Sequence, residues 1–550
     1  MPARSNLRSR LSLSYAGWQN RLRIARLARQ VAAHSLNSAK PLADNRPVVL
    51  FNASTRLTGL SLNAAFQLLT GWGLRLAGVQ VVHFVCQSGL QPCVLGTNRQ
   101  EYTAAPPCAS CLAQSRRLYA GAEVHGFGLK LDPQLSAALQ NLSVDELGAF
   151  EYYLPPLGDQ RSPIPLGRLV VPSIRWALRR HNLPDDEPTR YLLRQYILSA
   201  YNLAAQFAAC LAQVQPQSAL IFNGAMYPEA TARWVARQMG VRSVAHEVGF
   251  QRFSTFFTEG EPTAYPIHIP DEFELSEAQN EQLDAYLEQR FQGKFSMAGI
   301  RFWPEMRGLD EALLQKITSF RQVVPVFTNV VYDTSQVHAN VIFPHMFAWL
   351  ELVTEVIRAH LETLFVIRAH PDEMRPGTKK LSNESVQDWV HSRGIHQWPN
   401  VVFVGPVEYL SSYELIQQAK FVIVYNSSIG LEATLMGVPV LCGGKARYTQ
   451  YPTVYFPKSP GAFRRQADEF LQAESISVPT EYERNARRFL YYQLYRASIP
   501  MDEYLQTGPR PGFVLLRDFS WRQLQPDSSV PMRVLVDGIL EGKPFLMPEN

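Results

Sequence analysis

The chain has 550 residues, of which 46% are hydrophobic and 18% are charged. This length is too great for a single hydrophobic core and predicts two or three domains, while the composition is that of a globular protein and argues against intrinsic disorder. The formal net charge is only +5, and no long basic run carries interleaved aromatic residues, so a nucleic-acid-binding protein is not expected.

The basic excess lies at the start of the chain, where residues 1–43 contain arginines and a lysine but no acidic residue. Arg21 and Arg23 flank one helical face of this segment. Five apolar side chains lie on that face: Leu11, Tyr15, Trp18, Leu22 and Ala25. A basic amphipathic helix can lie on an anionic membrane, which predicts a cytoplasmic protein at the inner face of the plasma membrane. The alternatives are a poorly ordered tail and a helix packed on the protein itself. No apolar run suited to a signal peptide follows the arginines.

Residues 44–258 begin with a βαβ unit and are predicted to form a first Rossmann-like domain. A strand over Val48–Phe51 is followed by a polar loop, a helix over Leu60–Ala77 and a strand over Gly78–Cys86. Sheets of this kind bind ligands at the carboxyl ends of their strands. Three polar residues follow the first strand at that end: Asn52, Ser54 and Thr55.

Four of the six cysteines lie close together in the sequence: Cys86, Cys93, Cys108 and Cys111. Their spacing suits a zinc knuckle, and disulfides are disfavoured in a chain without a secretory signal. Cys86 ends an apparent buried strand, however, and also suits the hydrophobic core. A structural zinc is therefore an alternative, while the expectation is that the cysteines bind no metal. A catalytic metal is not expected, because four thiolates leave no open coordination position.

The sequence carries no charged residue between Arg194 and Glu229. Polar side chains interrupt this stretch, and Pro216 would break a helix that crossed a membrane. We therefore predict a buried helix that ends near Val214 and leads into a strand over Ala219–Phe222, and no transmembrane helix.

A second βαβ unit spans Ser218–Phe250, and its two strands end in polar residues. The first strand ends at Asn223, and the second ends at His246 and Glu247. Adjacent ionisable residues at a strand end are suited to general-base catalysis. Glu247 or His246 is therefore the predicted catalytic base, the alternative being a hydrogen-bonded structural group.

Residues 259–320 are rich in charged and helix-forming residues and predict linking helices between two lobes. Residues 321–475 then resume the alternation of strands and helices. Strands are predicted over Val323–Phe327, Leu364–Ile367 and Val401–Val404. The first of them ends in Thr328 and Asn329.

Arg368, His370 and Pro371 follow the second of these strands. Arg368 offers a planar bidentate donor for a phosphate, and His370 can donate a hydrogen bond to another phosphate oxygen. Pro371 disfavours helix at His370 and holds the turn open. Because parallel strands end on one side of a sheet, these residues predict a phosphate site shared with the neighbouring strand ends. No G-x-G-x-x-G or Walker A sequence competes with it.

The stretch Phe421–Tyr448 organises this second domain. It predicts a buried strand, a polar turn, a short helix that stops at Gly437, and a further strand. Ser427 or Ser428 is predicted to cap the helix, whose start forms an anion site. Glu432 lies in the first helical turn, where it either accepts hydrogen bonds from a sugar or complements the helix dipole alone.

The sequence NSSIGLEATLMGVPV, followed by GGKARY, resembles the capsule-polysaccharide-synthesis family and, more loosely, the nucleotide-binding half of GT-B glycosyltransferases. In that family a Ser-Ser/Thr-x-Gly-x-Glu-Ala segment, here including Gly430, lies against the sugar nucleotide. The resemblance implies that Glu432 lies near the ribose and that Ser427 and Ser428 lie near the phosphates. The family also carries a histidine–proline turn, which His370 matches. The resemblance is good over this stretch and patchy over most of the chain.

Residues 476–550 are predicted to form a helical extension that braces the first lobe, as a late helix does in GT-B proteins. Four of its side chains are expected in the core: Phe489, Leu490, Tyr492 and Leu494.

The expected fold is α/β, with two Rossmann-like lobes, a C-terminal helical extension and a basic N-terminal helix. The resemblance implies a metal-independent glycosyltransferase that needs no cofactor and moves a sugar from a nucleotide-sugar donor to a capsular or surface glycan, free or lipid-linked. The predicted donor site comprises Thr328, Asn329, Arg368, His370, Ser427, Ser428, Gly430 and Glu432. The alternatives are a sugar-nucleotide epimerase on the same fold and a non-catalytic scaffold of a glycan assembly complex.

Overall fold

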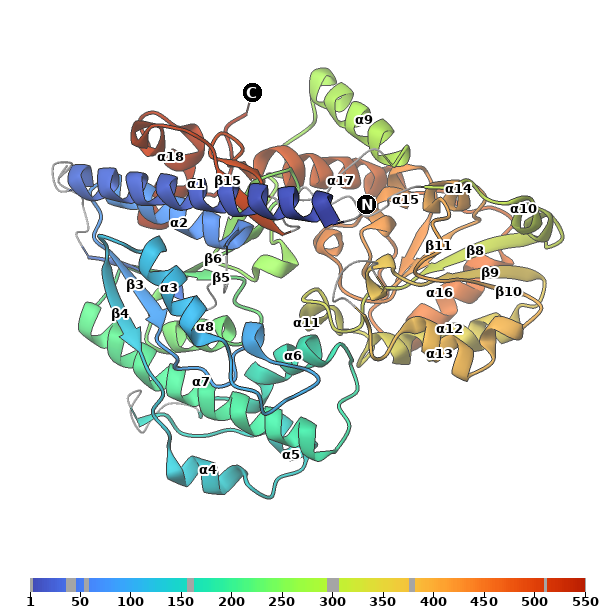
Figure 1. Ribbon diagram of the computed structural model, residues 1–550. Helices are drawn as coiled ribbons and strands as arrows, with labels where there is room; N and C mark the ends of the chain where they lie inside the picture. Colours follow the sequence, from blue (N-terminus) through green and yellow to red (C-terminus); the bar gives the residue numbers. More distant parts are fainter. Residues whose placement is uncertain are drawn as a thin grey trace.

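The computed structural model describes residues 3–35, 46–53, 59–155, 163–293, 306–374, 381–508 and 512–549. They form two α/β lobes, each built around a mainly parallel sheet (Figure 1). The predicted α/β class with two Rossmann-like lobes is confirmed. Ser54 and Thr55, predicted beside a ligand site, lie outside the described residues.

The sheet of the first lobe has seven strands in the order β13-β7-β6-β5-β1-β3-β4. The strands β6, β5, β1, β3 and β4 run parallel, while β7 is antiparallel to β6 and β13 is antiparallel to β7. In sheet order the bounds are β13 (Ile499–Pro500), β7 (Ser254–Thr258), β6 (Arg242–Val248), β5 (Ser218–Phe222), β1 (Val48–Asn52), β3 (Val81–Cys86) and β4 (Glu123–Phe127).

Hydrophobic cores cover both faces of this sheet, because successive strand residues point to opposite sides. Val48 and Leu50 of β1 belong to the core beneath α2 (Leu62–Leu76), whereas Val49 and Phe51 belong to the core beneath α7 (Glu187–Val214). The other helices of the lobe are α3 (Cys108–Leu118), α4 (Pro133–Leu139), α5 (Val144–Gly148), α6 (Leu166–Leu178) and α8 (Glu229–Gln238).

Among the described helices, α7 alone is long and apolar enough to cross a membrane by length and composition. Leu193, Ile197 and Phe207 on this helix are fully buried and belong to the core of the first lobe. The helix therefore has the setting of a core helix, as the interrupted sequence pattern predicts.

The second lobe contains a five-stranded parallel sheet in the order β10-β9-β8-β11-β12. Its strands are β8 (Gln322–Phe327), β9 (Thr363–Arg368), β10 (Val401–Val404), β11 (Val422–Val424) and β12 (Val440–Cys442). Its helices are α10 (Glu311–Thr318), α11 (Gln336–Ala339), α12 (Met346–Ala359), α13 (Val386–Ser392), α14 (Ser412–Gln417), α15 (Ile429–Leu435) and α16 (Pro460–Gln472).

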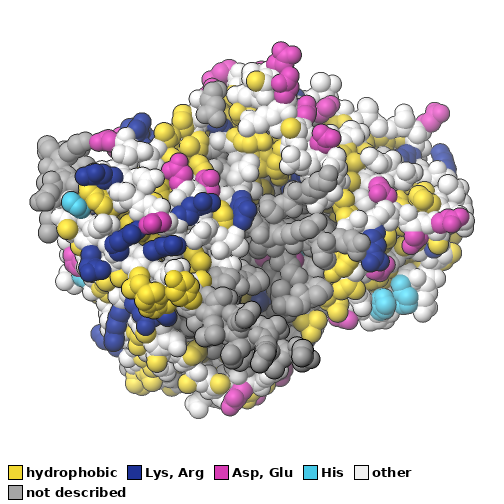
Figure 2. Space-filling model, turned by 45° about the horizontal axis from the view of Figure 1, so that its top comes forward, with side chains coloured by type: hydrophobic (Ala, Val, Ile, Leu, Met, Phe, Trp, Pro, Cys, Tyr) yellow, Lys and Arg dark blue, Asp and Glu magenta, His cyan; other side chains and the backbone are white. Residues whose placement is uncertain are grey.

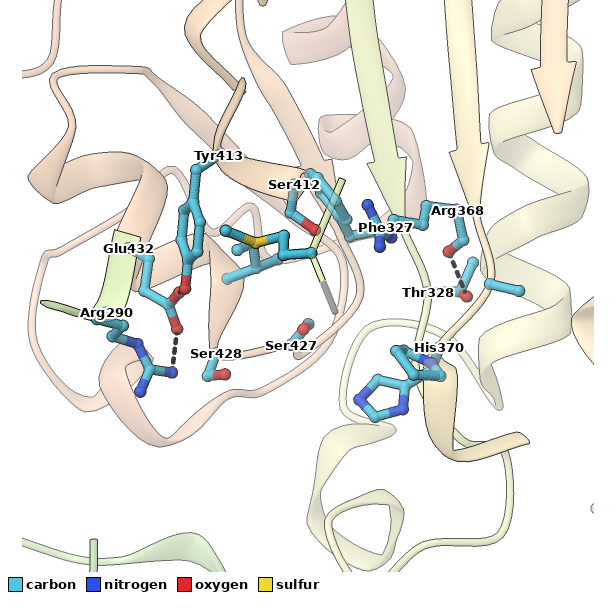
Figure 3. A pocket seen from close by; sticks show the side chains of 14 residues that line it. Arg290, Phe327, Thr328, Arg368, His370, Ser412, Tyr413, Ser427, Ser428 and Glu432 are labelled. Carbon is cyan, nitrogen blue, oxygen red and sulfur yellow. Dashed lines mark hydrogen bonds and ion pairs between the residues drawn. The ribbon is translucent and has the colours of Figure 1, made fainter. Parts of the chain in front are cut away.

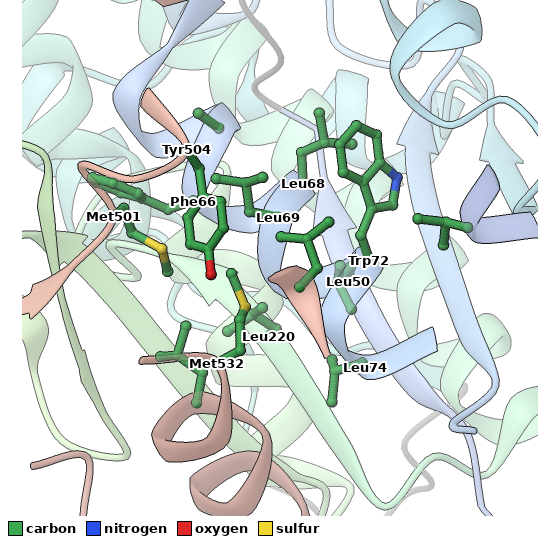
Figure 4. Packing of buried hydrophobic residues seen from close by; sticks show 14 of the residues in the cluster. Leu50, Phe66, Leu68, Leu69, Trp72, Leu74, Leu220, Met501, Tyr504 and Met532 are labelled. Carbon is green, nitrogen blue, oxygen red and sulfur yellow. The ribbon is translucent and has the colours of Figure 1, made fainter. Parts of the chain in front are cut away.

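The C-terminal part of the chain belongs to both lobes. Helix α17 (Thr480–Tyr491) packs on α15, and the predicted core residues Phe489, Leu490, Tyr492 and Leu494 are buried there. The chain then returns to the first lobe, where β13 joins the seven-stranded sheet and α18 (Val530–Glu541) packs on α2. Figure 4 shows Met501, Tyr504 and Met532 of this return segment around Phe66 and Leu69 of α2. A small antiparallel sheet of β14 (Leu505–Thr507), β15 (Phe513–Leu516) and β2 (Leu60–Ser61) completes the contact.

The segment predicted as linking helices, residues 259–320, has a different organisation. It is irregular up to α9 (Glu277–Phe291), which packs on α17, and α10 contributes Leu313 and Ile317 to the core of the second lobe. Among the described residues, the segment that follows the first lobe is therefore irregular apart from the 3-10 turn Pro262–Ala264, and the helices belong with the second lobe and the C-terminal extension.

Helix α1 (Ala3–Ser35) lies along the first lobe and packs on α2 and α3. The packed face is formed by Ile24, Leu27, Ala28 and Val31, all buried in the core. The apolar face predicted from the sequence lies elsewhere on the helix. Its three large side chains in the described part are about half exposed: Tyr15 at 59%, Trp18 at 49% and Leu22 at 50%.

Candidate functional site

A cavity opens at the carboxyl ends of β8, β9 and β11 in the second lobe (Figure 3). Side chains from all three strand ends line it, as the parallel topology predicts. Six of the eight residues predicted for the donor site lie around it: Thr328, Arg368, His370, Ser427, Ser428 and Glu432. The structure therefore brings together in one place residues that are separated by up to 104 positions in the sequence.

Arg368 is the last residue of β9 and is almost completely buried beside this cavity. Its backbone carbonyl accepts hydrogen bonds from the N–H of Thr328 (3.2 Å) and from the Thr328 hydroxyl (2.9 Å), which tie β8 to β9 at this end. Burial lowers the pKa of Arg368 to about 10, although Glu408 and Tyr413 oppose this effect. The guanidinium is still cationic at neutral pH and attracts an anion strongly in this low-dielectric setting.

His370 lines the cavity from the turn that follows β9. Its Nδ1 accepts a hydrogen bond from the backbone N–H of Asp372 at 3.1 Å, which caps the short 3-10 turn Pro371–Glu373. Because Nδ1 is an acceptor, the neutral ring carries its proton on Nε2. The local fold thus fixes both the orientation and the tautomer of this imidazole.

The turn before α15 brings Ser427 and Ser428 to the cavity. The prediction was that Ser427 or Ser428 caps the helix. It is wrong for Ser428, because the backbone of this residue is already helical (φ −59°, ψ −21°) and its hydroxyl makes no capping bond. Gly430 does not line the cavity. A β-carbon there would lie 2.3 Å from the Tyr448 hydroxyl, so this glycine is required for packing. Gly437 follows the helix with φ +78°, as predicted.

Glu432 is held by two partners that sequence reasoning missed, Arg290 and Tyr413. Its Oε1 accepts a hydrogen bond from Arg290 Nη2 at 2.6 Å, and its Oε2 accepts one from the Tyr413 hydroxyl at 2.6 Å (Figure 3). Burial works to lower the pKa of Arg290, but the Glu432 carboxylate outweighs it and the pKa is raised. The Glu432 carboxylate is therefore not wholly free to accept hydrogen bonds from a ribose. Glu432 belongs to a buried ion pair at the wall of the cavity.

A second cavity adjoins the first and shares His370, Ser427 and Ser428 with it. Asn329 lines this second cavity, and its amide donates to Asn426 Oδ1 at 2.7 Å. Two cations also line it, Lys445 and Arg447. Both belong to the GGKARY sequence, whose basic residues are the signal that could have identified them.

Arg447 also reaches the first lobe. Its guanidinium carbon lies 4.1 Å from the ring centre of Tyr265 and 4.9 Å from that of Phe250. Phe250 lines the second cavity together with Asn329 and Lys445. This cavity therefore lies between the lobes, whereas the first lies within the second lobe.

The first lobe presents Glu247 at the carboxyl end of β6, where it lines a third cavity with Asn52 and Asn223. Glu247 Oε2 accepts a hydrogen bond from Asn223 Nδ2 at 2.7 Å, and Oε1 accepts one from the N–H of Val248 at 2.8 Å. Burial raises the pKa of Glu247, although these two hydrogen bonds and the charge of Arg447 lower it. The interaction with Arg447 places this carboxylate near the cleft between the lobes.

His246 does not occupy a comparable position. The ring is fully buried, stacks on Phe257, and has its Nε2 at 3.1 Å from Gln67 Oε1, so Nε2 carries the proton. Burial lowers the pKa of His246 to about 3. Neighbouring residues of a strand point to opposite faces of the sheet. Because Glu247 faces the cavity, His246 points into the core. His246 is therefore not suited to be the catalytic base, which corrects that alternative. Glu247 is the remaining candidate.

Residues 304–454 match the family model described as capsule polysaccharide biosynthesis protein. This range contains β8 to β12 and every residue predicted for the donor site. The matched range, here called the capsule-synthesis domain, lies on the second lobe. The resemblance drawn from NSSIGLEA and the histidine–proline turn is thus confirmed for this capsule-synthesis domain. No curated protein sequence matches the chain.

Solved structures resemble the chain only remotely. A Thermosulfurimonas dismutans KpsC beta-Kdo 2,4-transferase is 14% identical, with 56% of this chain and 87% of that chain covered and a TM-score of 0.34. The UDP-GlcNAc 2-epimerase from Neisseria meningitidis bound to UDP-GlcNAc is 11% identical, with 81% and 98% covered and a TM-score of 0.23. The N-terminal domain of Candida albicans trehalose-6-phosphate phosphatase is 10% identical, with 83% and 94% covered and a TM-score of 0.32.

Proposed function

We propose that this protein is a glycosyltransferase of capsular polysaccharide synthesis, which takes its sugar from a nucleotide-activated donor. The observation that carries the proposal is the cavity of the capsule-synthesis domain, where Arg368, His370, Ser427 and Ser428 meet at neighbouring strand ends. The chemistry of these groups suits a diphosphate or phosphate ester, since a guanidinium, an imidazole N–H and two hydroxyls all donate hydrogen bonds to anionic oxygen.

In the proposed reaction, the acceptor hydroxyl attacks the anomeric carbon of the donor, and the bond from that carbon to the phosphate oxygen breaks. Negative charge then develops on the departing phosphate. Arg368 and the Nε2–H of His370 stabilise that charge, and because the fold already holds both, little reorganisation accompanies the reaction. Glu247 accepts the proton of the acceptor hydroxyl from the side of the first lobe.

We propose further that the transfer needs no metal ion. Among the described residues that line the donor cavity, Glu432 is the one carboxylate, and both of its oxygens already accept hydrogen bonds from Arg290 and Tyr413. Hard divalent cations that hold phosphates prefer carboxylate oxygens. The donor set of this cavity instead supplies cationic and N–H groups, which fulfil the same electrostatic role.

Replacing His370 with alanine is expected to lower transfer from the donor by about 10²-fold, in the range typical for loss of one hydrogen-bond donor to developing charge. The test incubates purified protein with a panel of nucleotide sugars and a capsular oligosaccharide, and follows the labelled sugar by mass spectrometry. His268→Ala, at an exposed histidine outside the cavities, serves as the control and should retain full activity.

Two results would contradict the proposal. A His370→Ala protein that transfers sugar as fast as the parent would remove this cavity as the donor site. A product that stays linked to its nucleotide, with no sugar on the acceptor, would identify an epimerase instead.

We also propose that helix α1 holds the protein on the anionic cytoplasmic face of the membrane. Support comes from its exposed apolar face of Tyr15, Trp18 and Leu22, where the first two rings stack at 6.0 Å between centres. Arg21 and Arg29 are also exposed on this helix. Aromatic side chains beside arginines suit the interface between lipid headgroups and acyl chains. Figure 2 views the side of the molecule that carries α1, where blue basic and yellow hydrophobic side chains lie close together.

The test of membrane binding uses Trp18→Ser with Leu22→Ser. A deletion of the segment is unsuitable, because Leu27 and Val31 of the same helix belong to the core. Binding to vesicles that contain anionic lipid should fall at least tenfold, given about 1.5–3 kcal/mol for each buried large apolar side chain. Leu361→Ser, at a leucine that is 64% exposed on the other lobe, should bind as the parent does. Equal binding of parent and double variant, or binding that salt does not weaken, would contradict the proposal.

A further inference from the structure

Four cysteines from three separate segments line one cavity in the first lobe. Cys86 ends β3, Cys93 precedes the 3-10 turn Val94–Gly96, and Cys108 and Cys111 lie in the first turn of α3. All are free thiols. The two remaining cysteines of the chain, Cys210 and Cys442, are not part of this cavity. The fold thus brings the C-x-x-C pair, Cys108 and Cys111, close to two cysteines that lie 15 or more positions earlier in the sequence.

A backbone N–H group points at the sulfur of Cys93. Gly96 N–H donates to Cys93 Sγ at 3.2 Å. Turns that aim N–H groups at a sulfur favour the thiolate form, and the thiolate is the form that binds a metal.

Burial works against these thiolates in the absence of a cation. The cavity that the four cysteines line is otherwise mostly apolar, with Ala53, Leu90 and Pro228 among its lining residues. Several thiolates in one apolar cavity therefore repel one another unless a cation lies among them. A soft divalent ion would remove this penalty and release the thiol protons to solvent.

We propose that Cys86, Cys93, Cys108 and Cys111 bind one zinc ion, which draws the four sulfurs together. Within the described ranges no group of three or more His, Cys, Asp or Glu side chains stands in a metal-holding arrangement, so the four sulfurs must move closer together when zinc binds. The sulfurs then surround the ion at about 2.3 Å in a tetrahedron. Four thiolates close the coordination sphere, which makes this zinc structural.

The position of the cluster indicates what the zinc stabilises. Val94 and Leu95, which follow Cys93, line both the cysteine cavity and the cavity that contains Glu247. The segment between Cys86 and Cys108 has little regular structure of its own, with the short turn at Val94–Gly96 as its helical part. A zinc ion would fasten this segment to β3 and α3 and so fix one wall of the proposed acceptor side.

The test measures zinc in the full-length protein by inductively coupled plasma mass spectrometry after purification in zinc-supplemented, reducing buffer. One zinc per chain is expected for the parent and for Cys210→Ser, a matched control in the same lobe. Cys108→Ser and Cys111→Ser are each expected to lose most of the metal. A parent protein with less than about 0.1 zinc per chain would overturn the proposal, as would full retention of zinc in both serine variants.

A second measurement on the unchanged chain covers the case in which the serine variants fail to fold. Zinc added to chelator-treated protein should protect four thiols from a thiol reagent under native conditions and release protons. Unaltered reactivity of all thiols after zinc addition would overturn the proposal. An intact-mass measurement that reveals disulfides among these four cysteines in reducing buffer would also overturn it. Because these readouts do not involve sugar transfer, they stand apart from the test of the glycosyltransferase.

Discussion

Replacing Glu247 with glutamine is expected to reduce kcat/KM for sugar transfer by about 10²–10⁴-fold, the usual contribution of a general base. Glutamine keeps the shape of the side chain and can still accept from Asn223, but it cannot take up the proton of an attacking hydroxyl. Steady-state transfer assays on parent and variant would measure the effect. Glu272→Gln, at an exposed carboxylate, should have parent activity.

The pH dependence of the parent gives an independent test of the same carboxylate. Burial raises the pKa of Glu247 above its ordinary value of 4.5. A base acts only when deprotonated, so the rate should rise as pH increases through this raised pKa and fall below it. The acidic limb of the profile should therefore lie above 4.5 and disappear in Glu247→Gln. Equal activity and an unchanged acidic limb in the variant would assign the base elsewhere.

Glu432→Gln is expected to destabilise the second lobe by about 3–5 kcal/mol, because it leaves the charge of Arg290 buried without its counter-ion. The side chains of the pair are only 9% and 6% exposed, so solvent screens them weakly. A role confined to the helix dipole would predict about 0.3–1 kcal/mol. Urea denaturation followed by circular dichroism would separate these two outcomes.

A double-variant comparison isolates the pair itself. Adding Arg290→Met to Glu432→Gln removes the unpaired cation and should restore much of the lost stability. Asp284→Asn, which breaks the more exposed pair between Asp284 and Arg487, should cost no more than about 1 kcal/mol. A loss below 1 kcal/mol for Glu432→Gln would show that the ion pair is not important for the fold.

The second lobe could be predicted well from the sequence because its strands are short, apolar and followed by polar residues. The strand predicted over Val401–Val404 has the same bounds in the structure. That regularity was sufficient to place Thr328, Arg368 and His370 at one sheet edge, since parallel strands must end on the same side. The predicted site was thus a consequence of topology, which local sequence patterns can reveal.

What could not be predicted depends on contacts between distant residues or on weak local signals. Arg290 lies 142 positions before its partner Glu432, in a helix whose sequence carries no mark of a buried arginine. Strand β4 contains His125 and Gly126 and is largely exposed at the edge of its sheet, so it lacks the apolar run of a buried strand. His246 is buried and Glu247 lines a cavity because the two side chains lie on opposite faces of β6.

The path of the C-terminal segment limits how the two lobes can move. The chain leaves the first lobe after β7 and returns to it at β13, and these two strands are paired neighbours, with Ile499 opposite Thr255. Two covalent connections therefore run side by side at one edge of the sheet. We expect such a pair to act as a hinge, which permits opening of the cleft by rotation and resists twisting and sliding. Opening and closing of the cleft would thus move Lys445 and Arg447 relative to Glu247 along a single arc.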